Sequence, residues 1–141
     1  MVTTPSPPRS SCPINFGLEI FGDQWTLLIL RDILIQQKRT FREFQASDEA
    51  IASNILAERL KRLEGCGLVT REASTADGRV ALYNPTDAAR DLIPILVEMS
   101  YWGATYDRST GAPPAFKAAY RADREGLIAS IRAGRDPSRA D

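Results

Sequence analysis

The stretch Ile51–Leu68, IASNILAERLKRLEGCGL, constrains the fold of this chain more than any other. Leu56, Leu60 and Leu63 recur at spacings of four and three residues, which places three leucines on one face of a helix. The two glycines that follow the last leucine supply the freedom to adopt a positive φ with which helices commonly end. We therefore predict one amphipathic helix with a defined C-terminal stop.

The face opposite the leucines is small, polar and partly basic. Asn54, Glu58 and Lys61 lie on it, with Ala57 and Arg62 at its margins. A short helix of this kind can lie in a DNA major groove, because Asn, Ser, Arg and Lys side chains reach base edges and phosphates. An ordinary amphipathic surface helix has the same pattern, so the neighbouring segments have to decide between the two interpretations.

The segments before this helix predict a helix-turn-helix. Asp23 can cap a helix over residues 24–35, which is so rich in Leu and Ile that we expect it at the buried centre. The segment Thr40–Glu43 fits the T-x-x-E capping box and predicts a helix over residues 41–46. Two short helices joined by a tight connection, the second with an open polar face, are typical of that motif.

The segments after it predict a β-hairpin. Leu68–Ala73 and Val80–Tyr83 alternate between apolar and polar residues, and Asp77-Gly78 between them is a turn signal. Such a hairpin is the wing of a winged helix-turn-helix, where Arg71 and Arg79 can reach a phosphate or the minor groove. A solvated hairpin without a ligand is the alternative.

A long apolar stripe follows the hairpin. Residues 86–106 predict a helix capped by Thr86 and kinked by Pro94. The stripe is longer than a small core needs, so it packs either on the same helix of a second subunit or on the last helix of its own chain. Its members are Leu92, Ile95, Leu96, Met99, Trp102 and Tyr106.

The two ends of the chain differ in composition. Residues 1–11 are rich in Pro, Ser and Thr, and we expect a disordered tail there. Residues 12–107 form the expected winged helix-turn-helix domain with its dimerisation helices. Residues 108–141 comprise a linker, an extra helix over 115–133 with Gly126 as its weak spot, and a loose tail from Gly134.

Composition excludes several classes of function. Lys and Arg number 18 and so do Asp and Glu, hence the chain is no general polycation, and any nucleic-acid site depends on local charge. Histidine is absent, and two cysteines alone make no zinc site. We find no paired nucleophile and base and no phosphate loop, so we expect no enzyme, no metal and no cofactor. No segment has the length and hydropathy of a membrane span or signal peptide, which favours a soluble cytoplasmic protein.

The ordered series of motifs resembles the HxlR-type winged helix-turn-helix regulators of bacteria, which are related to the MarR regulators. The resemblance covers about residues 12–103. It implies a mainly helical fold with a small β-hairpin wing. It also implies a homodimer that binds double-stranded operator DNA, with the first and last helices of the family forming the dimer interface. Pro85 and Ala89, where many members have Leu and Gly, put the local geometry after the wing in doubt. The matching motifs are Cys12-Pro13, Gly22–Arg31, Lys38–Phe44, Ile51–Leu68, Tyr83 with Thr86, and Pro94 with Trp102.

Within this framework the reading helix supplies the contacts to bases. A dimer would place two copies of it in successive major grooves about 34–36 Å apart, on an inverted repeat. Asn54 is the best candidate, because an amide can pair with adenine through two hydrogen bonds, although a helix-start role remains open. Glu58 either accepts from a cytosine amine or pairs with Lys61 or Arg62 and holds that cation in place. The base-reading candidates are Ser53, Asn54, Ala57 and Glu58.

Contacts to phosphates and between subunits complete the predicted sites. Arg59 projects to the flank of the leucine face, where a structural ion pair and a phosphate contact are both open. The phosphate and wing candidates are Lys38, Arg39, Thr40, Arg42, Lys61, Arg62, Arg71 and Arg79. The candidates for the dimer interface are Ile14, Leu18, Leu92, Leu96, Met99, Trp102 and Tyr106.

Cys12 is the candidate for a switch. In part of the family a cysteine at this place senses electrophiles or oxidants, and such a thiol needs accessibility and a nearby positive charge, which Arg9 and a helix start can supply. An inert residue at a helix start is the alternative, and we expect Cys66 to be a small buried residue. A small-molecule effector near Trp25, Trp102 or Tyr106 is a further hypothesis.

The sequence thus predicts a homodimeric, sequence-specific transcriptional regulator. The alternative is a winged helix that binds other proteins and no DNA, which the neutral net charge of the chain permits. Salt-dependent binding to one specific duplex distinguishes the two.

Overall fold

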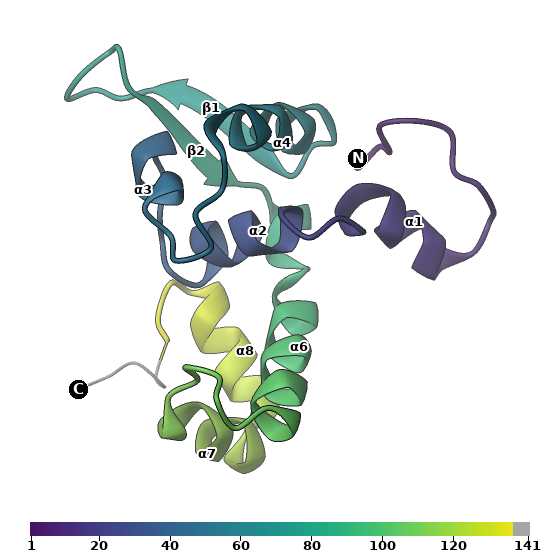
Figure 1. The fold of residues 1–141 in the computed structure, drawn as a ribbon, viewed down its shortest axis with the longest axis vertical. Helices are drawn as coiled ribbons and strands as arrows, with labels where there is room; N and C mark the ends of the chain where they lie inside the picture. Colours follow the sequence, from purple (N-terminus) through teal and green to yellow (C-terminus); the bar gives the residue numbers. More distant parts are fainter. Residues whose placement is uncertain (137–141) are drawn as a thin grey trace. The chain divides into compact units, whose positions relative to one another are not determined.

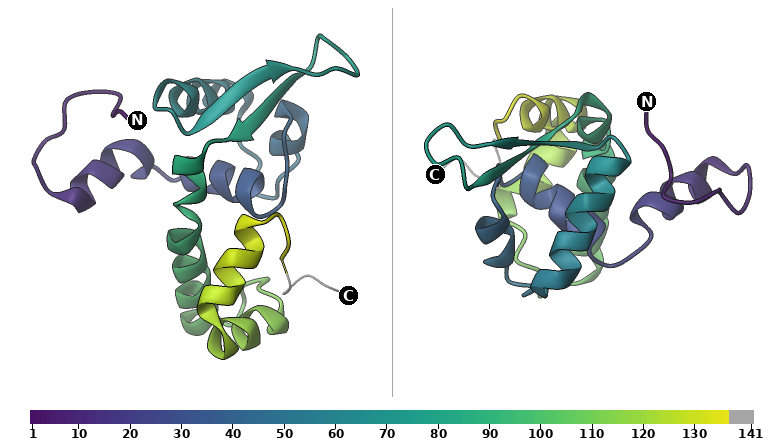
Figure 2. Two further views of the ribbon diagram at one scale, coloured as in Figure 1. Left: turned by 180° about the vertical axis from the view of Figure 1, so that it is seen from behind. Right: turned by 90° about the horizontal axis from the view of Figure 1, so that it is seen from above.

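The computed structural model describes residues 1–136 of the chain. It divides into two compact units, the first comprising Met1–Ala89 and the second beginning at Arg90. Figures 1 and 2 show the elements of each unit. The first unit contains α1 (Pro13–Phe21), α2 (Thr26–Leu34), α3 (Phe41–Gln45), α4 (Ser53–Gly65), β1 (Val69–Ala73) and β2 (Ala81–Pro85). After α5 (Asp87–Arg90), the second contains α6 (Ile93–Tyr106), α7 (Pro114–Ala122) and α8 (Arg124–Arg132).

The helix-turn-helix predicted from the sequence is confirmed as α3 and α4. The capping box at the start of α3 forms: the Thr40 hydroxyl accepts from the Glu43 N–H at 3.3 Å, and the Glu43 carboxylate accepts from the Thr40 N–H at 3.1 Å. The helix α4 begins at Ser53, two residues later than expected, because Ala52 has an extended backbone and occupies the cap position. Its leucine face lies in the core of the unit, since Leu56, Leu60 and Leu63 are buried.

The end of α4 explains the glycine pair in the sequence. Gly67 adopts a φ of 85°, the left-handed conformation that glycine tolerates without strain. The Gly67 N–H donates to the Glu64 carbonyl and the Leu68 N–H to the Leu63 carbonyl, which is the Schellman arrangement. The chain therefore leaves the helix sharply and enters β1.

The predicted hairpin is also confirmed. β1 and β2 pair antiparallel in the register Val69 with Pro85 through Ala73 with Ala81. Tyr83 anchors it on the helices, because its N–H donates to the Arg39 carbonyl at 2.8 Å and its ring meets that of Phe44 edge to face. The far end of the hairpin projects away from this anchor (Figure 2).

The expected single helix over residues 86–106 is wrong. α5 ends at Arg90 and α6 restarts at Ile93, with Pro94 in its first turn. Proline lacks an N–H and is tolerated in a first turn, where no N–H is needed for an intrahelical bond. The chain therefore begins a new helix at this proline instead of kinking an old one.

The expected single helix over residues 115–133 is also two helices. α7 and α8 meet at Asp123, whose backbone is extended and whose carboxylate accepts from the Gly126 N–H at 2.9 Å. Asp123 is thus the N-cap of α8, a role that its side chain favours over a helix interior. The break lies at this aspartate, and Gly126 lies inside α8.

In the second unit α6 packs against both α7 and α8. The rings of Tyr101 and Tyr120 stack with centroids 3.9 Å apart. The Tyr120 hydroxyl donates to the Glu98 carboxylate at 2.8 Å, and Arg124 also pairs with Glu98. The last helices of the chain therefore cover the face of α6 that carries Glu98 and Tyr101. Packing on these helices does not account for the predicted apolar stripe, because Ile95, Met99, Trp102 and Tyr106 remain exposed.

The N-terminal stretch contains no helix or strand before Pro13, but Thr3 and Arg9 in it contact later residues of the first unit. The Thr3 N–H donates to the Cys66 carbonyl at 3.2 Å, and the Arg9 guanidinium pairs with Glu19 at 2.6 Å. Disorder of this tail stays a prediction, as does a domain boundary at residue 107. The expected loose C-terminal tail lies outside the described residues from 137 on. Among the helices described, none has the length and apolar character needed to cross a membrane.

Candidate nucleic-acid interface

The outward face of α4 has the composition that the sequence predicted. Asn54, Glu58 and Lys61 are exposed along it, and so are Ser53 and Ala57. The first turn of α4 has no side-chain cap, because the cap position is held by Ala52. No hydrogen bond within the described residues engages the side chain of Ser53 or Asn54. Both side chains are therefore available to a ligand beside open N–H groups of a helix start.

Glu58 has a partner on its own helix. Its carboxylate pairs with the neighbouring Arg59, whereas the sequence left Lys61 and Arg62 as the expected partners. Lys61 consequently has no acidic partner among the described residues. The outward face of α4 thus presents one free cation and one acid that is already engaged.

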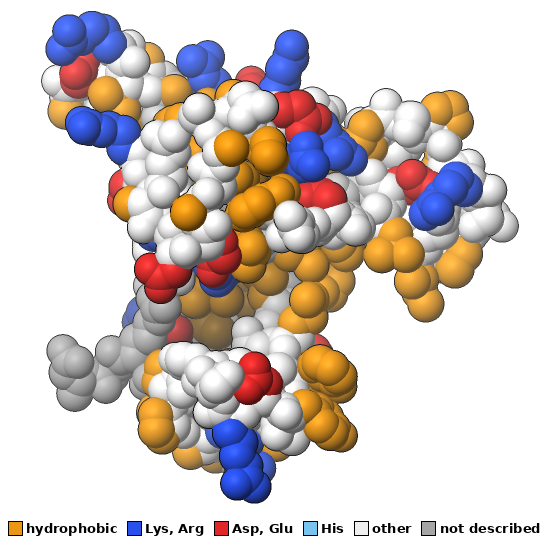
Figure 3. Space-filling view, viewed as in Figure 1, with side chains coloured by type: hydrophobic (Ala, Val, Ile, Leu, Met, Phe, Trp, Pro, Cys, Tyr) orange, Lys and Arg blue, Asp and Glu red, His pale blue; other side chains and the backbone are white. Residues whose placement is uncertain are grey.

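Exposed cations surround this face. The side chains of Arg42 on α3, Lys61 on α4 and Arg71 on β1 are exposed, and none makes an ion pair or hydrogen bond within the described residues. Figure 3 shows Lys and Arg side chains projecting outward along the edge formed by the hairpin and α4. The local charge that a nucleic-acid site needs in a chain of zero net charge is therefore present here.

The tip of the hairpin carries a cation with a local partner. The Arg79 guanidinium pairs with Asp77 at 3.2 Å, and its side chain is 92% exposed. This contact lowers the pKa of the Asp77 carboxyl. Arg71 and Arg79 line the same hollow of about 220 Å³ on the hairpin. The wing thus offers one free guanidinium and one that a solvated acid partly neutralises.

Lys38 and Arg39, two of the expected phosphate contacts, are engaged inside the fold. The Lys38 ammonium donates to the Ser47 hydroxyl at 2.6 Å. The Arg39 guanidinium donates to the Ile33 carbonyl at 2.7 Å, at the C-terminal end of α2. Thr40 is occupied as the cap of α3. Lys38 and Arg39 thus join segments of the first unit, while Thr40 caps α3.

The two arginines on the flank of α4 hold the helix against α1 and its following turn. Arg62 donates to the Glu19 carbonyl at 3.2 Å, near the end of α1. Arg59 pairs with Asp23 at 3.2 Å, which is the structural ion pair that the sequence offered as one of two alternatives for this residue. Burial would raise the pKa of Asp23, but hydrogen bonds from Thr26, the Trp25 N–H and Arg59 lower it to about 2.

A buried acid in α2 is the feature that the sequence interpretation missed. Asp32 is 2% exposed and is held by Arg31, Ser47 and Lys38. Its one signal in the sequence is an acid in the middle of the apolar run TLLILRDIL, where a carboxylate needs partners to be tolerated. Among the described residues no group of three or more His, Cys, Asp or Glu is placed to hold a metal.

The two cysteines differ as the sequence predicted. Cys12 is exposed at the N-cap position of α1, whereas Cys66 is buried and burial raises the pKa of its thiol. Arg9, the cation expected beside Cys12, instead contacts Asn15 and Glu19. The side chain of Arg9 is thus engaged by α1 residues, and Cys12 lies at the start of that helix.

Apolar side chains are exposed on α1 and on α6. Ile14 is 75% exposed and Leu18 is 49% exposed on α1, where Phe16 joins them. On α6 the exposed residues lie at spacings of four, three and four: Ile95, Met99, Trp102 and Tyr106. Leu92 is half-buried, and Leu96, which we expected at the subunit interface, is buried with Ile93 and Val97. Figure 3 shows hydrophobic side chains on the surface of α1.

The chain resembles proteins that are known or proposed to regulate transcription. A family model described as HxlR-like helix-turn-helix matches residues 20–110. The HTH-type transcriptional regulator YybR of Bacillus subtilis is 31% identical over 97 residues, which are 69% of this chain and 77% of YybR.

Two solved structures extend the likeness to the fold. The crystal structure of PA1607, a protein proposed to be a transcription factor, has 38% sequence identity and a TM-score of 0.63, over 70% of this chain and 67% of PA1607. The redox regulator HypR in its oxidized form has 30% identity and a TM-score of 0.61, over 68% of this chain and 98% of HypR. The mainly helical winged helix-turn-helix fold is thereby confirmed, and the chain belongs to the HxlR-like helix-turn-helix family of transcriptional regulators.

Proposed function

We propose that this protein is a homodimer that binds an inverted-repeat operator through α4 and responds to oxidants through Cys12. The observation that carries the DNA-binding part is the free amide of Asn54 in the first turn of α4, on a face flanked by cations without partners. Within the family, the sequence of this face decides which bases are read. A regulator with these contacts acts where the chromosome lies, in the cytoplasm of a bacterium.

Ser53, Asn54, Ala57 and Glu58 are the proposed base-reading residues. They are exposed on the N-terminal half of α4, the part of a recognition helix that contacts base edges. Asn54 is assigned to an adenine, because its amide can donate and accept at once. Glu58 is assigned a weaker part, since Arg59 already engages its carboxylate.

Arg42, Lys61 and Arg71, with Arg79 at the wing tip, are the proposed phosphate contacts. They come from α3, α4 and the hairpin, so one DNA backbone segment on each side of the reading helix can be held. We leave Lys38, Arg39, Thr40 and Arg62 out of this set, because their side chains are bound to other parts of the first unit.

The exposed apolar faces of α1 and α6 are the proposed dimer contacts. Trp102 and Tyr106 are 66% and 75% exposed, and their rings lie 5.2 Å apart. Large apolar side chains gathered on one helix face are typical of an interface. On α1 the corresponding residues are Ile14, Phe16 and Leu18.

Cys12 is the proposed sensor. The solved relative HypR is a redox regulator whose oxidized form is known. In this chain Cys12 is exposed and unpaired, and it lies at the start of the helix α1 that carries one of the proposed dimer faces. Oxidation of its thiol would therefore change a surface next to the proposed subunit contact.

The test is binding of the purified protein to duplex DNA from upstream of its own gene and to a scrambled duplex, over a range of salt concentrations. We expect the wild type to prefer one upstream fragment and Asn54→Ala to lose that preference, while Glu64→Ala, on the same helix but far from its start, keeps it. A preference that survives Asn54→Ala removes this residue from the reading face. Equal weak binding of both duplexes by the wild type would favour a protein-binding module.

The redox part is tested by the same assay before and after a thiol oxidant. We expect the oxidant to change operator affinity in the wild type and to leave Cys12→Ser unaffected. An equal response of both proteins would exclude Cys12 as the sensor.

A further inference from the structure

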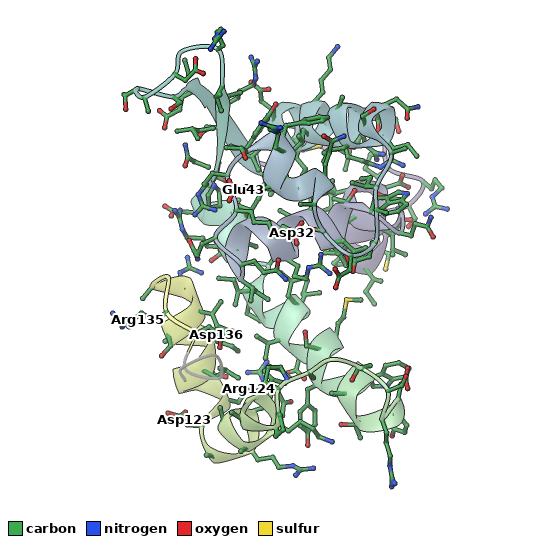
Figure 4. The ribbon with its side chains drawn as sticks, turned by 60° about the vertical axis from the view of Figure 1, so that its left-hand side comes forward. Asp32, Glu43, Asp123, Arg124, Arg135 and Asp136 are labelled. Atoms are coloured by element: carbon green, nitrogen blue, oxygen red, sulfur yellow. The ribbon has the colours of Figure 1, made fainter. Side chains whose placement is uncertain are left out.

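Asp32 is the centre of a polar cluster under the helix-turn-helix. Figure 4 labels it on α2, within the first unit. Arg31 donates to one carboxylate oxygen at 2.7 and 3.0 Å, and the Ser47 hydroxyl donates to the other at 2.5 Å. The Lys38 ammonium lies 3.8 Å from the second oxygen. A carboxylate that is 2% exposed is tolerated because these partners replace its water.

The partners of Asp32 come from three separate places in the chain. Arg31 lies beside it on α2, Lys38 lies in the connection to α3, and Ser47 lies in the connection from α3 to α4. The Lys38 N–H also donates to the Asp32 carbonyl at 2.9 Å. One buried carboxylate therefore ties α2 to both connections of the helix-turn-helix.

The connection to α4 is held at a second point. Arg31 makes two hydrogen bonds to the Glu49 carboxylate, at 2.8 and 3.0 Å. The paired geometry of arginine and carboxylate fixes direction as well as distance. The hydrogen bonds from Arg31 lower the pKa of Glu49. Ser47 and Glu49 are thus both fixed to α2.

The backbone between this connection and α4 is strained. Ala50 has a φ of 55°, a left-handed conformation that residues with a Cβ disfavour. Its N–H donates to the Ser47 carbonyl at 3.0 Å, and Ile51 after it is buried. A strained turn persists only when its surroundings determine it, and here Ser47 and Glu49 are those surroundings. Ser53, the first residue of α4, follows three residues after Ala50.

We propose that Asp32 is a positioning residue for DNA reading, which through Ser47, Arg31 and Glu49 fixes the turn that presents Ser53 and Asn54. In the same cluster Lys38 serves as a counter-charge to Asp32 and not as a phosphate contact. The inference rests on the proposed function of α4 as the reading helix. According to this proposal, Asp32 contributes to operator selectivity because it fixes the direction in which α4 leaves the turn.

Ser47 is the position at which to test this, because its hydroxyl is the direct link between the turn and Asp32. Ser47→Ala removes the link and leaves the ion pairs of Arg31 in place. We expect the ratio of operator to scrambled-duplex affinity to fall about tenfold. The slope of affinity against salt should stay as in the wild type, because the number of phosphate contacts is unchanged. Ser47→Thr keeps a hydroxyl at this place and should restore the ratio.

A second measurement needs no DNA. The chain has three lysines, Lys38, Lys61 and Lys117, so reductive methylation with ¹³C-formaldehyde gives a resolvable NMR signal for each. The Lys38 side chain is 21% exposed and held by Ser47, whereas Lys61 is exposed and has no partner among the described residues. We expect Lys38 to react several times more slowly than Lys61 in the wild type. In Ser47→Ala its rate should approach that of Lys61.

Three results would overturn the proposal. The first is an unchanged affinity ratio in Ser47→Ala, and the second is methylation of wild-type Lys38 as fast as that of Lys61. The third is a fall of the salt slope by about 1 in Lys38→Met, as we expect for Lys61→Met. If the wild type shows no operator preference at all, the proposed function fails and the reading role of the cluster fails with it. A protected Lys38 would then show that the cluster itself is formed, so the two failures are distinguishable.

Discussion

The first unit holds two groups of cationic side chains that the sequence alone does not distinguish. In one group each side chain is bound to another part of the fold; its members are Arg31, Lys38, Arg39, Arg59 and Arg62. In the other group the side chains are exposed without a partner among the described residues; its members are Arg42, Lys61 and Arg71. The first group joins helices, and the second is available to a phosphate backbone.

The difference follows from where each residue lies relative to helix ends. Arg39 and Arg62 donate to carbonyls in the last turns of α2 and α1, where the carbonyls lack intrahelical partners and the helix dipole favours a positive charge. Lys61 precedes Arg62 by one residue, but the helix turns it outward. Neighbours in the sequence therefore belong to different groups, and the following predictions test that division.

The largest expected effect concerns Asp23, the acid that holds Arg59. Its carboxyl has a pKa of about 2 in the folded protein, against an ordinary value of 3.8. The lowered pKa means that the charged form stabilises the fold above about pH 5, by at most about 2 kcal/mol because the site is partly exposed to solvent. This contribution is lost as the pH falls toward 2. Asp23→Asn should therefore lower the free energy of unfolding by up to about 2 kcal/mol at pH 7.

Urea unfolding of wild type and Asp23→Asn at several pH values checks this prediction. The difference between the two proteins should be constant from pH 7 to about 5 and then shrink as the pH falls toward 2. Glu19, Glu43 and Glu49, whose pKa values are also lowered, titrate in both proteins and cancel in the difference. A difference that does not change with pH would mean that the charge of Asp23 is not what stabilises the junction.

Arg59 and Arg71 form the next test, as one member of each group. Arg59→Met breaks the ion pair with Asp23 and should lower the free energy of unfolding by about 1 kcal/mol without changing the salt slope of DNA binding. Arg71→Met should change unfolding by less than about 0.5 kcal/mol and reduce the slope by about 1. Equal slopes for the two variants would contradict the division into two groups.

Several structural features of the first unit could be predicted from the sequence. The faces of α4 followed from the leucine spacing, the start of α3 from the capping box at Thr40 and Glu43, and the wing from the alternation of Leu68–Ala73. These features are encoded within a few residues, since a helix repeat or a cap needs only local neighbours. Local patterns therefore predicted α4 and the exposure of its polar side chains.

Local sequence patterns could not predict the partners of the arginines on α4. Arg59 meets Asp23 across 36 positions of sequence, and Arg62 meets Glu19 across 43. Only the packing of α4 on the first helices brings these pairs together, so periodicity cannot distinguish a phosphate contact from a structural one. The break at Asp123 was missed for a related reason, because an aspartate inside an apolar repeat becomes a cap only where the chain turns back to pack.

Arg79 lies between the two groups and gives the smallest expected effect. It is as exposed as the free cations, but Asp77 holds its guanidinium through two contacts, at 3.2 and 3.3 Å. Asp77→Asn removes the acid charge and keeps an oxygen that can accept from the Arg79 N–H, so the turn should be preserved. The freed guanidinium should strengthen binding to operator and scrambled duplexes alike and raise the salt slope by at most 1.

The control for this last variant is Asp107→Asn, which changes the net charge equally but removes a carboxylate bound to Ser109 after α6. A similar gain from both variants would show that net charge alone matters. A gain confined to Asp77→Asn would place the wing tip at the DNA and make Asp77 a local limit on its affinity. Unchanged DNA binding in both variants would leave Arg71 as the proposed wing contact and Arg79 as a solvated residue of the hairpin tip. If no phosphate lies within reach of Arg79, removing the charge of Asp77 does not change DNA affinity.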